Sequence, residues 1–190
     1  MTALTGQLDG ASNVLVAAPS MGGTRDACST LLTEGLTEPR VVFVTFTRQP
    51  RACVAQWDET GATASAVAVI TVGDGGGDLD RADVAVENVS TPSDLTGLGI
   101  KIGQVLSEWD DPVAVCFDSL TAMLQYVDVE TAYEFLHAIT GQFHAAGARA
   151  HFHIDPEAHD PIQVDAITSL MDARVDLGDE VRVRTREVIE

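Results

Sequence analysis

Residues 13–32 read NVLVAAPSMGGTRDACSTLL, and the expected fold is built around them. Its apolar run predicts a buried strand at 14–18, a glycine turn at 21–23 and a helix that begins near Thr24. A strand, a tight glycine turn and a helix N-terminus in that order are typical of a phosphate-binding loop, in which backbone N–H groups hold an anion. The stretch therefore predicts an α/β domain built around such a turn.

The turn keeps the frame of the phosphate-binding motif but little of its chemistry. The motif G-x-x-x-x-G-K-[ST] falls on residues 18–25, which read A-P-S-M-G-G-T-R. Gly23 keeps the second glycine, whereas Thr24 replaces the lysine and Arg25 replaces the hydroxyl residue that holds magnesium. Should a nucleotide bind, we expect its phosphates beside Ser20, Met21, Gly22, Gly23, Thr24 and Arg25.

The composition predicts one acidic, soluble domain. The chain has 190 residues, with 29 acidic and 11 basic side chains, a net charge of −18, and Lys101 as its one lysine. So large an acidic excess indicates a halophilic protein, because concentrated salt screens its self-repulsion. The same charge argues against binding nucleic acid or an anionic membrane surface.

The cysteines and the hydropathy pattern predict a cytoplasmic location. Cys28, Cys53 and Cys116 are widely spaced, and we expect buried thiols rather than disulfides. No apolar run has the length of a transmembrane helix, and the N-terminus lacks the basic region of a signal peptide.

The rest of the chain alternates apolar strands with amphipathic helices. Strands are expected at 41–47, 66–72, 113–118 and 148–154, and helices at 24–34, 50–60, 93–109, 129–144 and 160–171. Two short strands at 173–177 and 181–189 predict a C-terminal β-hairpin. This order indicates a mostly parallel sheet with helices on both faces, preceded by a short lead-in at residues 1–11 and forming a single domain over 12–190. We also expect Ser93 to cap the helix at 93–109 and residues 73–83 to form a solvated acidic loop.

This order of parts resembles the RecA/KaiC branch of the P-loop ATPases. Three runs also resemble a family of small haloarchaeal KaiC-like proteins with degenerate nucleotide motifs: SDLTGLG at 93–99, CFDSLT at 116–121 with LQYVD at 124–128, and HFHIDP at 151–156 with HD at 159–160. The likeness extends from about residue 11 to 185. It implies a RecA/KaiC-like sheet in which the first strand lies beside the strand that carries His151.

The resemblance also indicates what is missing for ATP hydrolysis. Asp118 stands where these ATPases keep a strand-end carboxylate that orders magnesium through water. In the same ATPases a glutamate after the second strand activates the attacking water, but here the place reads Phe46-Thr47-Arg48. We therefore predict no catalytic residue.

A histidine group near the end of the fifth strand is an alternative site. His151, His153 and Asp155 alternate, so an extended strand would place them on one face, and His159 follows shortly after. Such a set could bind zinc or another divalent metal. The alternative is that these histidines hydrogen-bond neighbouring loops and cap the end of the strand.

A second alternative concerns the last strand, where Arg182, Arg184 and Arg186 share one face. This face could contact an acidic partner or another protomer, or it could protect an edge strand against aggregation.

The sequence thus leaves three functions open. The first is a non-catalytic regulatory or interaction module without a cofactor, which binds a protein partner or associates with itself. The second is an ATP-binding switch with magnesium, in which Arg25 replaces the lysine. The third is a metal-binding protein that uses His151, His153 and His159.

Overall fold

The computed structural model describes residues 6–19, 32–33, 35–77, 79–109, 112–178 and 181–186. The glycine turn and most of the helix expected after it therefore lie outside the described residues.

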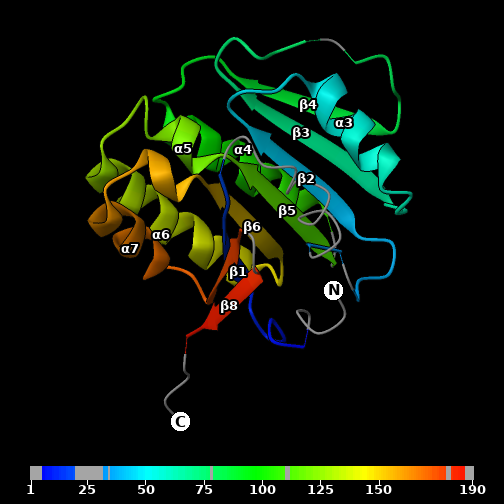
Figure 1. The fold of residues 1–190 in the computed structure, drawn as a ribbon. Helices are drawn as coiled ribbons and strands as arrows, with labels where there is room; N and C mark the ends of the chain where they lie inside the picture. Colours follow the sequence, from blue (N-terminus) through cyan, green and yellow to red (C-terminus); the bar gives the residue numbers. More distant parts are fainter. Residues whose placement is uncertain are drawn as a thin grey trace.

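The described strands form one sheet of eight, in the order β4-β3-β2-β5-β6-β1-β7-β8 (Figure 1). Their bounds are β1 Asn13–Ala17, β2 Arg40–Thr45, β3 Ala66–Val72, β4 Val84–Val89, β5 Val113–Asp118, β6 Arg149–Ile154, β7 Ala173–Leu177 and β8 Val181–Thr185. Every neighbouring pair is parallel except the β7–β8 pair, which is antiparallel. The predicted α/β fold with a mostly parallel sheet and a C-terminal hairpin is confirmed.

Helices cover both faces of the sheet, as expected for parallel strands buried on two sides. The helices are α3 Pro50–Glu59, α4 Leu95–Glu108, α5 Leu120–Met123, α6 Val129–Ala145 and α7 Pro161–Thr168, with a short 3₁₀ turn, η1, at Pro156–Ala158. One hydrophobic core joins the sheet to α4, α5, α6 and α7. A second core on the opposite face contains Cys53, Val54 and Trp57 of α3, together with Leu32.

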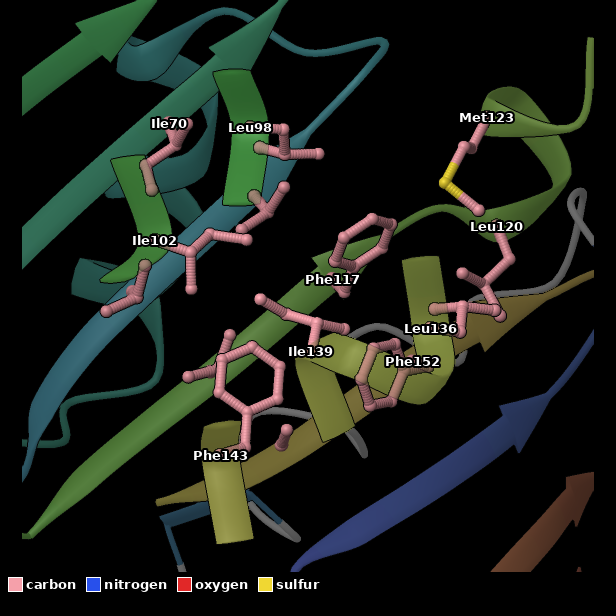
Figure 2. Close-up of a cluster of buried hydrophobic side chains, with 14 of the residues drawn as sticks. Ile70, Leu98, Ile102, Phe117, Leu120, Met123, Leu136, Ile139, Phe143 and Phe152 are labelled. Atoms are coloured by element: carbon pink, nitrogen blue, oxygen red, sulfur yellow. The ribbon is translucent and has the colours of Figure 1, made fainter. Parts of the chain in front are cut away.

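The larger core is centred on Phe117 of β5 (Figure 2). Its ring lies 5.6 Å from that of Phe152 on β6, 5.9 Å from that of Phe46 and 6.4 Å from that of Phe135 on α6. Leu98 and Ile102 of α4 belong to the same core (Figure 2). Because tilted aromatic pairs of this kind add to the burial of apolar area, this cluster fixes α4 and α6 on the sheet.

β1 lies between β6 and β7, and Val14 is in register with His151 while Val16 is in register with His153. This neighbour relation confirms the expectation that the first strand lies beside the strand that carries His151. The pairing continues past β1, since the Ala18 N–H donates to the Ile154 carbonyl at 2.9 Å. Ala18 therefore lies next to the carboxyl end of β6.

Two local predictions were wrong or incomplete. The N-cap of α4 is Asp94 rather than Ser93, because the Asp94 carboxylate accepts a hydrogen bond from the Gly97 N–H at 2.8 Å. The strand β4 was not expected, since only its end residues Val84 and Val89 are buried and its middle faces solvent at the sheet edge. The glycine-rich acidic segment connects β3 to this edge strand.

Candidate site at the carboxyl ends of β2, β5 and β6

The topology points to the carboxyl ends of β2 and β5. These strands are neighbours, but the chain leaves β2 for α3 on one face and leaves β5 for α5 and α6 on the other. In open α/β sheets ligands bind outside the carboxyl ends of the strands where successive connections diverge in this way. The residues at these ends are therefore the candidate functional site.

The side chains of Arg48 and Asp118 form an ion pair at this point. The Arg48 Nε lies 3.0 Å from the Asp118 Oδ2, and the two side chains are only 13% and 14% exposed. Thr45 is in register with Asp118, and its hydroxyl accepts a hydrogen bond from the Arg48 N–H at 3.0 Å. On the other side, the Arg48 guanidinium donates to the Gln56 side chain of α3. The guanidinium is thus held between the end of β5 and α3.

This pair determines the charge of the site. The positive charge of the Arg48 guanidinium compensates the Asp118 carboxylate. A carboxylate that is already paired and mostly shielded from water has less to gain from a divalent cation. The Asp118 carboxylate is therefore balanced within the chain by Arg48.

Cys116 and His153 lie on the same face of the sheet, next to the ion pair. The Cys116 Sγ is 3.7 Å from the His153 Nε2, and the thiol is buried while the imidazole is half-buried. Burial lowers the pKa of His153, but the charge and hydrogen bond of Cys116 and the charge of Asp118 outweigh it, so the pKa of His153 is raised. Arg48 acts in the opposite direction.

His151 lies deeper in the same face and behaves differently. Its side chain is 1% exposed, in register with Val14 on one side and Cys116 on the other. Burial, followed by the charges of His153 and Arg149, lowers the pKa of His151 to about 3. His151 is therefore neutral at physiological pH.

Asp155 and His159 belong to the loop after β6, where both contact Thr121 of α5. The Thr121 hydroxyl lies 3.2 Å from the His159 Nε2 and accepts from the Asp155 N–H at 2.8 Å. The Asp155 carboxylate caps η1 by accepting from the Glu157 N–H at 3.0 Å. Among the described residues, no three His, Cys, Asp or Glu side chains form a group that could hold a metal ion. Of the four residues of the predicted metal site, all of them described, His151 and His153 thus lie on one face of β6, whereas Asp155 and His159 lie in the loop after it.

The predicted phosphate-binding residues Ser20, Met21, Gly22, Gly23, Thr24 and Arg25 lie outside the described residues. Of that predicted set only Asp118 is described, and it forms the ion pair with Arg48.

The arginine face of β8 is partly neutralised within the chain. Asp176 of β7 accepts from Arg184 at 2.8 Å and from Arg174 at 2.6 Å. Burial alone would raise the pKa of Asp176, but its hydrogen bonds to Arg184 and Arg174 outweigh this and lower it. β8 is an edge strand of the sheet. Charged side chains on such a strand oppose edge-to-edge pairing with a strand of another molecule.

Within the part of the chain that the structure describes, no helix combines the length and the apolar character needed to cross a membrane.

Comparison with known proteins identifies a family but no activity. No curated protein matches the chain. Among solved structures, a protein from Pyrococcus horikoshii OT3, described only as the subject of a structural study, is similar over 94% of this chain and 88% of its own. The two share 13% sequence identity with a TM-score of 0.65, a likeness that concerns the fold alone. A family model, described as a family of unknown function, matches residues 11–177, so the chain belongs to the family DUF7504.

Proposed function

We propose that this protein is a non-catalytic, RecA/KaiC-like domain that serves as a regulatory or protein-interaction module. The observation that carries the proposal is the ion pair between Arg48 and Asp118. The sequence resembles RecA/KaiC-type ATPases, and from that resemblance a magnesium ion would be expected beside Asp118 instead of an arginine.

The pair opposes magnesium binding at the residue best placed for it. In the resembled ATPases the carboxylate at the position of Asp118 orders a hydrated magnesium ion. Here a guanidinium 3.0 Å away already balances that charge, with little access to water. Magnesium would have to displace a cation that Gln56 also holds, and it would leave Arg48 partly buried without its carboxylate.

The position of Arg48 adds a second argument. It belongs to the triplet Phe46-Thr47-Arg48, where the resembled ATPases carry the glutamate that activates water. An arginine cannot accept a proton from water, so the segment offers no general base. With Thr24 in place of the lysine as well, both the grip on a triphosphate and the means to hydrolyse it are weakened.

A domain that keeps the fold but neither binds nor hydrolyses a nucleotide would function by binding other proteins at its surface. We propose that it binds a protein partner or a second copy of itself, with no cofactor. The net charge of −18 makes a nucleic acid an unsuitable partner.

Thermal unfolding at molar salt tests the proposal, with ATP added in the presence and absence of magnesium. A ligand at about one hundred times its Kd stabilises the folded state by about 2.7 kcal/mol, which a thermal shift detects readily. We expect no magnesium-dependent shift for the wild-type protein. The variant Arg48→Gln, which leaves Asp118 without its guanidinium, should be more responsive to magnesium than the wild type. The matched control is Arg51→Gln, at an exposed position on α3.

A clear stabilisation of the wild type by ATP with magnesium, absent with ATP alone, would reject the proposal. Stabilisation by ATP that needs no magnesium and is abolished by Arg25→Ala would support the ATP-binding switch instead.

A further inference from the structure

Cys116 and His153 meet across two neighbouring parallel strands. Cys116 on β5 is in register with His151 on β6, so His153 lies two residues further toward the carboxyl ends and on the same face. The Sγ–Nε2 distance of 3.7 Å is suitable for a hydrogen bond to sulfur. The contact is therefore a consequence of the sheet register and of the extended backbone on either side.

The charges around this contact favour a proton on the imidazole. Asp118 follows on the same face of β5, Arg48 follows β2, and His151 lies deeper on β6. Arg48 and Asp118 compensate each other, and His151 is neutral because burial lowers its pKa to about 3. Among the described residues, the His153 imidazole contacts the Cys116 sulfur at 3.7 Å, and the pKa of His153 is raised mainly by that sulfur in opposition to burial.

We propose that Cys116 and His153 form a thiolate–imidazolium pair that makes Cys116 a site of oxidation by small peroxides. This activity goes beyond the proposed function and does not depend on it. A thiolate beside a protonated histidine is the usual arrangement of a reactive cysteine, since the thiolate rather than the thiol is the nucleophile.

The reaction is a two-electron oxidation of sulfur. The Cys116 thiolate attacks one oxygen of hydrogen peroxide, so that an S–O bond forms and the O–O bond breaks. The His153 imidazolium gives its proton to the departing hydroxide, which leaves as water. The products are a sulfenic acid at Cys116, whose oxygen keeps the hydrogen that it carried in the peroxide, and a neutral imidazole at His153.

Access to the pair is limited to small molecules. Cys116 is 8% exposed and His153 is half-buried, so the proposal is confined to an oxidant as small as hydrogen peroxide. Cys53 on α3 is 0% exposed in the core of the same sheet face, and it serves as an internal comparison for a thiol without access.

The test measures the rate at which hydrogen peroxide oxidises Cys116 in the folded protein, across mildly acidic to mildly alkaline pH. Dimedone traps the sulfenic acid, and peptide mass spectrometry assigns it to a cysteine. The variants are His153→Gln, the control His137→Gln at an exposed position on α6, and Cys116→Ser to verify the assignment. At about pH 6 we expect the wild type and His137→Gln to react at least about tenfold faster than His153→Gln, since an ordinary thiol has a pKa near 8.5. Cys53 should remain unlabelled.

Equal rates for the wild type and His153→Gln would overturn the proposal, as would a folded wild type in which Cys116 is not labelled at any pH. Should His153→Gln fail to fold, the pH profile of the wild type decides. A Cys116 rate that falls with acidification as it does in the urea-unfolded chain contradicts the pair, and one that persists to lower pH supports it.

Discussion

Replacing His151 should remove one contribution to the acid sensitivity of this protein. In the folded chain burial lowers the pKa of His151 from 6.5 to about 3, so the buried imidazole stays neutral. In the unfolded chain the same histidine regains its ordinary pKa and binds a proton as the pH falls. The unfolded state therefore binds more protons between these two values, and stability that is fully present above about pH 6.5 is lost on acidification toward pH 3.

The size of the effect follows from the two pKa values. Between about pH 7 and pH 4.5, a histidine with these values loses about 2–3 kcal/mol of folding free energy. His153, whose pKa is raised, acts in the opposite direction, because its contribution is present below its unfolded pKa and is lost as the pH rises. Buried and paired carboxylates also titrate in this range, so the wild type alone does not isolate His151.

Urea unfolding of the wild type and of His151→Gln, at constant salt and at several pH values, isolates the contribution. Near neutral pH the wild type should be the more stable, and its advantage should shrink by about 2–3 kcal/mol on acidification to about pH 4.5. His137→Gln, at an exposed position on α6, should show no such change. A difference between wild type and His151→Gln that stays constant across this range would refute the argument.

Two further predictions concern the ion pair and the core. In a double-mutant cycle of Arg48→Gln and Asp118→Asn, the coupling energy should be about 1–3 kcal/mol because the pair is mostly shielded from water, and a value near zero by urea unfolding would mean that the pair does not form. Phe117→Ala should destabilise by about 3–5 kcal/mol, since Phe117 is fully buried among three other aromatic rings, and a loss below about 1 kcal/mol in the same assay would contradict this packing.

The sheet could be predicted well where its strands are buried on both faces. The continuous apolar runs of β2, β3 and β5 have this character, and each was expected close to its observed bounds. β4 was not predicted, because it has no continuous apolar run. It is an edge strand, and the four residues between Val84 and Val89 are exposed or half-buried. For the N-cap of α4, both Ser93 and Asp94 are suitable residue types, and the choice depends on backbone geometry that the sequence does not specify.

The candidate site was predicted only in part. The place of Asp118 at the end of an apolar strand indicated a site residue. Arg48 lies in the segment where the resembled ATPases carry a glutamate. That the two form an ion pair depends on β2 and β5 being neighbours in register, a long-range fact that local sequence does not contain. Cys116 was expected to be a buried thiol. Its contact with His153 could not be expected, because it depends on the pairing of β5 with β6. One signal was available: Cys116 and Asp118 are two residues apart on one strand and therefore share a face.

The most direct test of the account is a crystal structure determined in the presence of ATP and magnesium. We expect the Arg48 guanidinium to remain on the Asp118 carboxylate and no magnesium ion to bind at that carboxylate. A magnesium ion coordinated near Asp118, with Arg48 displaced and nucleotide phosphates beside it, would contradict the account.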